Sequence, residues 1–384
     1  MGGFDEGLIT SILERFGPNV RPIIEAILLA LIAGAAISAA LNPILDLLFR
    51  AWRLVRWLGR VIRVRIRQLF GRTLTPTPPP APTRTIPEEQ TIWEKFAPSQ
   101  PAFPNMQGIP IITVANMKGG VGKTTIAANL AVYFRDKLKK PVLLIDFDYQ
   151  GSLSQTIRGE AGYTTPDLTA DILISDPTPT IDPPLYAREM RRDVENVFIY
   201  PTNYPFATIE NNLMADWLAR QGQGDLMYRL CNLLKQPAYQ DKYGAILIDC
   251  PPRLTTGSIN ALCASTHLLV PTNLDDMSAQ AAKYFLTQVN RMSQTVFPRV
   301  KIIGIVPSIV YGSGETLIGE RRTRDDLIEY GKSFWRRDNF LLTEGSVPRT
   351  ADISNFAGNG VASLRRTRAK QIFTKLGEEV EKRL

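Results

Sequence analysis

The strongest constraint on the fold is a series of six short runs made almost entirely of aliphatic residues. Each run is four to six residues long, and longer stretches of mixed composition separate it from the next. Strands buried on both faces have this near-continuous apolar character, whereas half-exposed strands alternate between apolar and polar residues. The pattern predicts a doubly wound α/β domain with a mostly parallel sheet. The runs occupy residues 111–115, 142–146, 197–200, 245–249, 267–271 and 301–306.

A glycine-rich segment follows the first run and reads NMKGGVGKTT over residues 116–125. Its second half, Gly122, Lys123 and Thr124, matches the end of the phosphate-binding pattern G-x-x-x-x-G-K-[ST]. Glycines let backbone N–H groups approach phosphate oxygens, and the N-terminus of the following helix adds a positive dipole. We expect Lys123 to reach the β and γ phosphates and Thr124 to ligate Mg²⁺.

The loop departs from the ordinary pattern, because the position of the first glycine is Met117 and a second lysine, Lys118, follows it. In this respect the loop resembles the deviant Walker A motif of the ParA/MinD family of dimeric ATPases. The resemblance covers roughly residues 110–384. Three further segments are similar to motifs of that family: VLLIDFDYQGSLS at 142–154, ILIDCPPRL at 246–254 and SVPRTADISNFAGNG at 346–360.

The resemblance implies an ATPase that converts ATP and water to ADP and phosphate in a homodimer with ATP sandwiched between two subunits. Lys118 would cross to the phosphates bound by the partner and neutralise developing charge, as an arginine finger does in other enzymes. The implied catalytic residues are Lys118, Asp148 and Lys123. The implied nucleotide-binding residues are Lys118, Gly119, Gly120, Val121, Gly122, Lys123, Thr124, Thr125 and Pro348.

Three carboxylates stand at the ends of predicted strands, Asp146 and Asp148 at one and Asp249 at another. The carboxyl ends of parallel strands face the crevice where ligands bind. By resemblance, Thr124, Asp146 and Asp249 are the metal residues for Mg²⁺, the two aspartates acting through water, and Asp148 positions or activates the attacking water. Where the family has proline after the second aspartate and serine after the Pro-Pro pair, this chain has Tyr149 and Arg253. Those departures bear on coupling to a partner more than on hydrolysis.

Residues 26–45 form 20 consecutive residues without a formal charge, enough for a helix of ~30 Å that could span a bilayer core. Two basic residues, Arg15 and Arg21, precede this stretch, and eight arginines follow it within residues 50–72. The positive-inside rule therefore predicts a single-pass membrane protein with its ATPase domain in the cytoplasm, at a bacterial inner membrane. A buried helix of a soluble core and a secretory signal are the alternatives.

The eight arginines have no acid between them and equal the whole net charge of +8. Apolar residues fill much of the space between them, as in a basic amphipathic helix on anionic lipid, where each arginine contributes ~1 kcal/mol. A solvated arginine face or a nucleic-acid patch is the alternative. Nine prolines then fall within residues 73–104, which is typical of an extended tether. Three aromatic residues in the tether are candidates to dock on the following domain: Trp93, Phe96 and Phe103.

The sequence thus predicts five parts: an N-terminal segment at 1–21, a transmembrane helix at 22–49, an arginine-rich juxtamembrane helix at 50–72, a proline-rich linker at 73–108 and a ParA/MinD-like ATPase domain at 109–384. Three cysteines without paired spacing favour a reducing compartment. The single histidine, His267, lies in an apolar run, which argues against a histidine-based metal cluster or catalytic triad.

The leading hypothesis is a membrane-anchored switch, in which ATP binding closes a dimer, hydrolysis opens it and an unidentified protein partner reads the difference. Nonspecific DNA is a further candidate partner, because basic clusters lie near residues 321–324, 336–337 and 365–368; solvated charge is the alternative. A bacterial tyrosine kinase shares the layout of membrane segment and deviant Walker domain, but this chain has no tyrosine after Tyr330. A nucleotide-gated scaffold with little turnover is a third reading.

Overall fold

The computed structural model describes residues 90–97, 108–161, 169–175, 188–189, 195–297, 300–311 and 318–384. The chain divides into two units, Met1–Pro87 and Glu88–Leu384, and every described residue belongs to the second. The predicted transmembrane helix at 22–49, the arginine-rich segment at 50–72 and Phe103 lie outside the described residues. Among the residues that are described, no helix has the length and apolar character needed to cross a bilayer.

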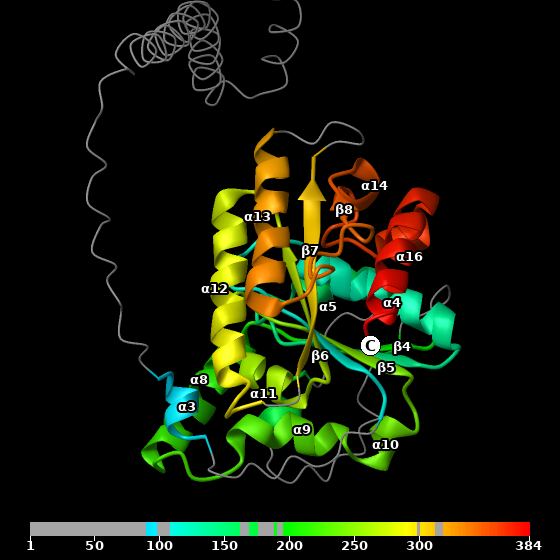
Figure 1. The fold of residues 1–384 in the computed structure, drawn as a ribbon. Coiled ribbons are helices and arrows are strands. Elements are labelled where there is room, and N and C mark those ends of the chain that lie inside the picture. The colour runs from blue at the N-terminus through cyan, green and yellow to red at the C-terminus, as the bar shows by residue number, and fades with distance from the viewer. Residues whose placement is uncertain are drawn as a thin grey trace, which may run out of the picture. The chain divides into compact units, whose positions relative to one another are not determined.

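The centre of the described domain is a sheet with the strand order β3-β4-β2-β5-β1-β6-β7-β8 (Figure 1). Neighbouring strands pair in parallel, except β3 and β4, which are antiparallel. The prediction of a mostly parallel α/β sheet is therefore confirmed. The strands are β1 (Ile111–Val114), β2 (Val142–Asp146), β3 (Arg188–Glu189), β4 (Val197–Tyr200), β5 (Ala245–Asp249), β6 (His267–Thr272), β7 (Lys301–Val310) and β8 (Val347–Pro348).

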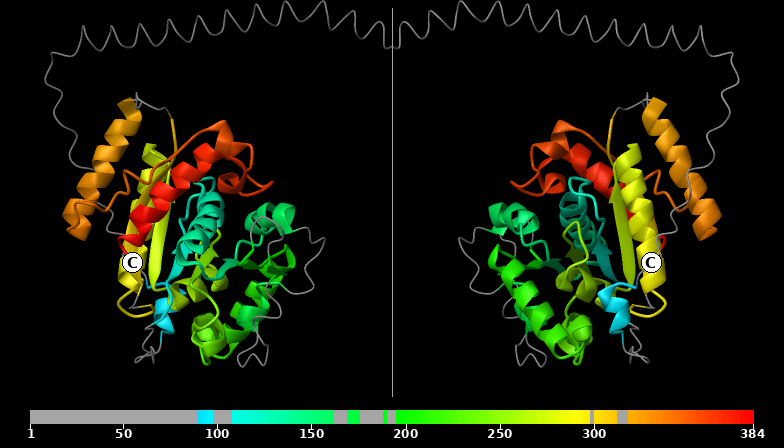
Figure 2. Two further views of the ribbon diagram at one scale, coloured as in Figure 1. Left: turned by 90° about the vertical axis from the view of Figure 1, so that its right-hand side faces the viewer. Right: turned by 90° about the vertical axis from the view of Figure 1, so that its left-hand side faces the viewer.

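Helices cover both faces of the sheet (Figures 1 and 2). Successive residues of a strand point to opposite faces, so Ile111 packs in one core and Ile112 in the other. This arrangement explains why the strands read as continuous apolar runs. One core includes side chains of α4 (Lys123–Leu138), α5 (Ser152–Ala161), α14 (Ala351–Ser354), α15 (Ala362–Arg365) and α16 (Thr367–Glu381).

The opposite face is covered by the two long helices α12 and α13 together with several shorter elements (Figure 1). The elements that contribute buried side chains to this second core are α3 (Ile92–Lys95), α6 (Ile172–Ser175), α8 (Pro205–Ala219), η1 (Leu226–Tyr228), α9 (Arg229–Leu234), α10 (Pro237–Gln240), α11 (Thr256–Ala264), α12 (Asp276–Met292) and α13 (Ile318–Trp335).

Helix α3 shows that the end of the proline-rich segment packs on the domain. The Trp93 ring is 3% exposed and stacks on Trp217 of α8 with 5.4 Å between ring centroids. Phe96 meets the same indole edge-on at 5.3 Å. Glu94 accepts two bonds from Arg291 of α12, at 2.8 and 2.9 Å, the bidentate geometry that makes such pairs strong. The sequence allowed Trp93 and Phe96 to dock on the domain, and the structure shows that both do.

His267 provides a test of the core near β6. Its side chain is only 6% exposed, and burial, with the nearby Lys301 charge, lowers its pKa from 6.5 to about 4. Protonation therefore favours the unfolded chain, so the stability that neutral His267 allows is complete above pH 6.5 and is lost as the pH falls toward 4. We expect the free energy of unfolding to fall by about 1–2 kcal/mol more between pH 7.5 and 5 than it does in His267→Gln, after allowance for solvent screening. Urea denaturation of both proteins at the two pH values measures the free energies of unfolding. An equal fall in the two proteins would contradict the lowered pKa of His267.

Candidate functional site

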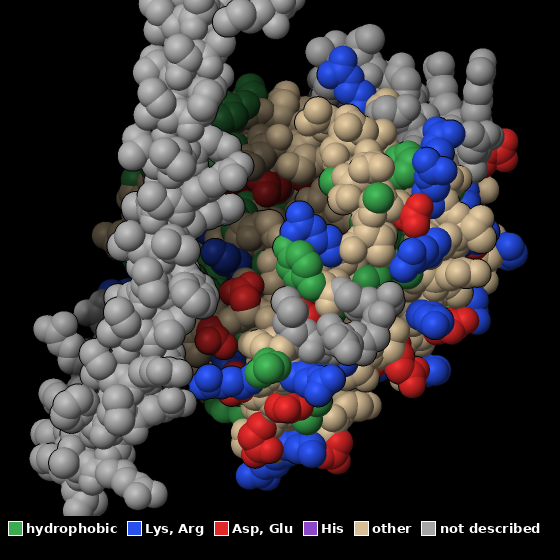
Figure 3. All heavy atoms as spheres, turned by 90° about the horizontal axis from the view of Figure 1, so that it is seen from above, with side chains coloured by type: hydrophobic (Ala, Val, Ile, Leu, Met, Phe, Trp, Pro, Cys, Tyr) green, Lys and Arg blue, Asp and Glu red, His purple; other side chains and the backbone are tan. Residues whose placement is uncertain are grey.

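The glycine-rich loop lies between β1 and α4, at the carboxyl end of the sheet, which is the face seen from above in Figure 3. Gly120 and Gly122 have φ of +72° and +80°, a backbone conformation that favours glycine. A Cβ placed on Gly119 or Gly120 would meet no atom within 4 Å. The backbone on this side of the loop is therefore open to a ligand, as a phosphate-binding loop requires.

Two polar residues hold the loop in place. Asn116 donates from Nδ2 to the Pro271 carbonyl at 2.7 Å and accepts from the Lys118 backbone N–H at 3.2 Å. Ser308 of β7 donates to the Val121 carbonyl at 2.6 Å. Sequence analysis missed both roles. Asn116 stands within the recognised segment, but Ser308 is 187 residues from Val121 along the chain, and no local pattern distinguishes it.

The two lysines of the loop have different environments. Lys123 is 7% exposed, and its Nζ donates to the Lys118 backbone carbonyl at 3.1 Å. Burial lowers the pKa of Lys123, and the charges of Asp249 and Asp148 oppose that change. Lys118 is half-buried, and within the described part of the chain its ammonium group has no hydrogen bond or ion pair. Lys123 is therefore held inside the loop of its own chain, whereas the Lys118 ammonium has no such partner among the described residues.

Asp146 and Asp249 lie side by side at the ends of β2 and β5, which are paired in register there. Asp249 accepts from the Thr124 hydroxyl at 2.6 Å, and its other oxygen is buried without a hydrogen-bond partner among the residues that the structure describes. Asp146 is fully paired: one oxygen accepts from Ser154 N and Oγ at 2.8 and 2.6 Å, and the other from Asp148 N at 3.1 Å. Burial raises the pKa of Asp146 to about 7, and burial together with the Asp146 charge raises that of Asp249 well above its usual range.

These residues fit a magnesium ion. Thr124 and Asp249 present a hydroxyl and a carboxylate at one point, and the partnerless Asp249 oxygen lacks the cation or donor that a buried carboxylate needs. Magnesium commonly takes one or two protein oxygens and completes its coordination with water and phosphate. Consistent with so few ligands, no group of three or more His, Cys, Asp or Glu among the described residues could hold a metal by itself. Asp146, whose oxygens are both engaged, can act only through its neighbours or water.

Asp148 is 8% exposed and accepts from the Gln150 N–H at 3.1 Å. The adjoining residues form an aromatic and cationic cluster: the Arg253 guanidinium lies 4.8 Å from the Tyr149 ring centroid, and Tyr149 meets Tyr204 edge-on at 5.6 Å. Tyr204 is 76% exposed. The two positions that depart from the family motifs, Tyr149 and Arg253, are therefore in contact with each other.

A cavity of about 450 Å³ begins at Gly122 and Thr125 of the loop and extends to Pro348 and Arg349. This volume is within the usual range for small-molecule sites. The structure thus brings Pro348, expected to border the nucleotide base, into the same cavity as the phosphate-binding loop. The roles of the individual site residues stay predictions.

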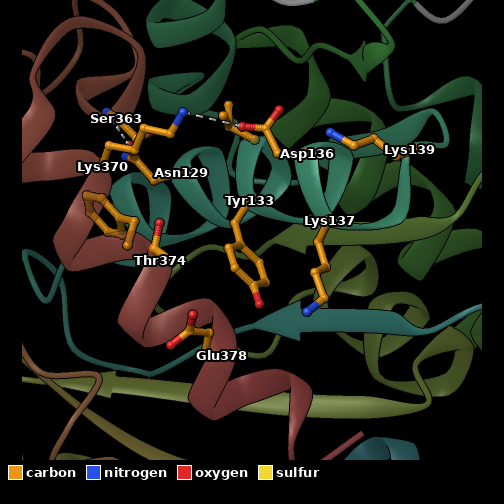
Figure 4. A pocket seen from close by; sticks show the side chains of 11 residues that line it. Asn129, Tyr133, Asp136, Lys137, Lys139, Ser363, Lys370, Thr374 and Glu378 are labelled. Carbon is orange, nitrogen blue, oxygen red and sulfur yellow. Dashed lines mark hydrogen bonds and ion pairs between the residues drawn. The ribbon is translucent and has the colours of Figure 1, made fainter.

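A second hollow, of about 530 Å³, lies between α4 and α16 (Figure 4). Its charged side chains are largely paired with each other or with neighbours: Lys370 lies 3.9 Å from Asp136, and Lys137 lies 3.4 Å from Glu381. Tyr133 also donates to Glu381 at 2.8 Å. The groove therefore presents compensated charge, unlike the carboxyl end of the sheet.

The parallel sheet, the open glycine loop and the carboxylates around Lys123 define a P-loop α/β domain. The family model described as an AAA domain, AAA_31, matches residues 109–302, which is just over half of the 384-residue chain. The chain belongs to this family.

Two relatives agree with that assignment, and a solved structure has the same fold. The chromosome partitioning protein ParA of Caulobacter vibrioides is 26% identical over 273 residues, covering 70% of this chain and 93% of that protein. The sporulation initiation inhibitor protein Soj of Bacillus subtilis is 28% identical over 273 residues, covering 70% of this chain and 97% of that protein. A cobyrinic acid a,c-diamide synthase of Mycobacterium smegmatis, solved with an ATP analog and magnesium, shares the fold with a TM-score of 0.54, 21% identity and coverage of 70% and 93% of the two chains. The resemblance of the ATPase domain to ParA-type proteins is confirmed.

Proposed function

We propose that this chain binds Mg-ATP at the glycine loop, pairs with a second copy across the bound nucleotide, hydrolyses ATP and so switches a partner complex. The observation that carries the proposal is the contrast between the two lysines. Lys123 is buried and held inside its own site, while the neighbouring ammonium of Lys118 has no partner in the described part of the chain. A second copy facing the loop would supply the phosphates that Lys118 lacks.

The chain's own residues have distinct tasks in this proposal. Lys123 exchanges a backbone carbonyl for phosphate oxygens, which are stronger acceptors for an ammonium group. Thr124 and Asp249 hold magnesium, which polarises and neutralises the phosphates when bound. Asp148, which accepts a single hydrogen bond, from the Gln150 N–H, positions the attacking water. The synthase of the same fold, with its ATP analog and magnesium, supports the choice of ligands.

The proposal is tested by measuring nucleotide binding and hydrolysis with purified full-length protein. We expect Lys123→Ala to weaken ATP binding by about 10²-fold or more, because a buried charge-assisted contact is worth several kcal/mol. Lys332→Ala, at an exposed lysine of α13, is the matched control and should match wild type. Equal ATP binding by Lys123→Ala and wild type would exclude this loop as the nucleotide site.

Residues 22–49 are proposed as a membrane anchor, with the arginines of 50–72 on anionic lipid at the cytoplasmic side. The support is the uncharged 20-residue stretch and the asymmetry of arginines around it. An integral protein stays with membranes through carbonate and high-salt washes and needs detergent for release. Release of the protein by a salt wash alone would show a peripheral attachment to the membrane and would contradict the proposed anchor.

In the structure, the basic clusters favour DNA binding less than their positions in the sequence did. Arg337 donates to the Ile302 carbonyl at 2.6 Å and so supports β7, while Arg321 and Arg322 are exposed on α13. The same helix carries Asp326, which pairs with Lys283. Charge on this surface is therefore mixed, and DNA is not part of our proposal. The tyrosine-kinase and scaffold alternatives differ in outcome: the first transfers phosphate to tyrosine, and the second shows nucleotide-dependent pairing with negligible phosphate release.

A further inference from the structure

Two loops at the carboxyl end of the sheet carry the carboxylates of the candidate site. The loop after β2 contains Asp148 and Tyr149, and the loop after β5 follows Asp249 and contains Arg253. The two strands are neighbours that pair in parallel. A contact between these loops therefore links the carboxylate expected to position water with the carboxylate expected to hold magnesium.

Arg253 and Tyr149 make such a contact. The Arg253 guanidinium lies 4.8 Å from the centroid of the Tyr149 ring, within the range of a cation–π interaction. Among the residues that the structure describes, this guanidinium has no hydrogen bond and no ion pair. Tyr204 meets the other tyrosine edge-on, with 5.6 Å between ring centroids. The ring of Tyr149 is therefore packed between a cation and a second aromatic ring.

The backbone of Arg253 is fixed, although its side chain is exposed. Its carbonyl accepts from Ser258 Oγ at 2.8 Å and from the Thr255 N–H at 3.2 Å. Both donors belong to the start of α11, where Thr255 is the N-cap residue. The fold therefore sets the place from which the guanidinium reaches the neighbouring loop.

Glu210 of α8 lies close to both loops. It is 4% exposed, and its Oε1 accepts from the Gly257 N–H at 2.6 Å. Burial raises the pKa of Glu210, whereas the nearby Arg253 charge lowers it and the Asp148 charge raises it. Because one buried carboxylate is affected by both charges, Arg253 and Asp148 lie on the same side of the site.

The segment on the other side of the contact is a tight turn that begins at Asp148. The Gly151 N–H donates to the Asp148 carbonyl at 2.7 Å, and the Gln150 N–H donates to the Asp148 carboxylate at 3.1 Å. Tyr149 is the second residue of this turn. The position of its ring and the direction of the Asp148 carboxylate are therefore set together.

We propose that Tyr149 and Arg253 form a positioning pair for hydrolysis, which holds the turn at Asp148 against the loop after Asp249. This inference rests on the proposed function. The pair fixes the distance between the water-positioning carboxylate and the magnesium site, and neither of its side chains touches the nucleotide. A displacement of about 1 Å in a positioned group can slow a reaction by about 10²-fold. The two departures from the family motifs thus serve hydrolysis.

The test is a double-mutant cycle on ATP hydrolysis by the full-length protein in detergent. We expect Arg253→Gln and Tyr149→Leu each to lower kcat about tenfold while KM for ATP stays within about twofold, because the pair orients groups for the chemical step. The double variant should be no slower than the slower single variant, as is typical of residues that act as a unit.

Conservative variants separate positioning from a general loss of structure. Tyr149→Phe keeps the ring and Arg253→Lys keeps a cation, so each should be at least about threefold faster than the variant that removes the interaction. Lys242→Gln is the matched control. It breaks another cation–π contact, 4.3 Å from the Phe198 ring, at the amino end of β5 and away from the site, and its kcat should equal that of wild type.

A wild-type kcat in both single variants, or losses that multiply in the double variant, overturns the inference. A Tyr149→Phe variant as slow as Tyr149→Leu also overturns it. Arg253 is exposed, so Arg253→Gln should melt as wild type does, and its kcat decides the outcome if Tyr149→Leu folds poorly. A wild type without ATPase activity would reject the proposed function together with this inference, whereas an active wild type with unaffected variants rejects this inference alone.

Discussion

Lys118→Ala is expected to bind ATP within about twofold of wild type and to hydrolyse it about 10³-fold or more slowly, as when an arginine finger is removed. The reason is geometric: Lys123 fills the position of the subunit's own lysine, bonded to the Lys118 backbone carbonyl, which alanine retains. In the proposed dimer, the lost ammonium would serve only the partner's site. Equilibrium nucleotide binding and phosphate release under multiple turnover measure the two effects separately, with Lys332→Ala as control.

Mixing variants makes this prediction sharper. Lys118→Ala lacks the cation it would lend, and Asp148→Ala lacks the carboxylate of its own site, so each homodimer is inactive. A mixed dimer contains one complete site, and random pairing should restore about a quarter of the wild-type rate in a symmetric dimer. No recovery on mixing, or a wild-type rate in Lys118→Ala alone, would show that Lys118 does not act across an interface.

Asp249→Asn is expected to lower magnesium-dependent hydrolysis by about 10²-fold or more, because a bound metal contributes several kcal/mol of charge stabilisation. The amide can still accept from Thr124, so the loop should keep its position. Without magnesium the substitution removes a buried carboxylate whose pKa is raised by burial and by Asp146, and the melting temperature in EDTA should not fall. Magnesium titrations of activity and melting curves in EDTA check both parts.

Asp146→Asn is the matched comparison, because it makes the same change one strand away. Ser154 donates to Asp146 from both its backbone N–H and its hydroxyl, and an amide nitrogen turned toward those donors would leave them unpaired. We expect a loss of about 1–3 kcal/mol in stability. If Asp249→Asn kept normal magnesium dependence while Asp146→Asn lost it, the metal assignments of the two aspartates would be reversed.

The parts of this structure that sequence predicts are those with a local signature. The runs at 142–146, 197–200 and 245–249 match their strands end for end, since burial on both faces favours apolar residues along almost the whole strand. Contacts between distant segments leave no such trace. The hydrogen bond from Ser308 to the loop, the pairing of β8 with β7 and the hydrogen bond from Asn116 to Pro271 each depend on residues brought together only by the fold.

Tyr149 and Arg253 illustrate the same limit from another side. Each departs from a family motif, and considered singly each shows only that the usual residue of the motif is missing. The structure places the guanidinium over the tyrosine ring at 4.8 Å, a cation–π distance. The two residues that depart from the motifs therefore contact each other, and they form a different local arrangement beside Asp148.

Helix α12 connects two features that the chain keeps apart. It begins at Asp276, shortly after Asn273 of the nucleotide cavity wall, and its last turn contains Arg291, which donates a hydrogen bond to Glu94 of α3. Its 17 residues make a rod of ~25 Å. A displacement of α3 would therefore act, through the Glu94–Arg291 pair, on one end of a helix whose other end lies close to the nucleotide cavity.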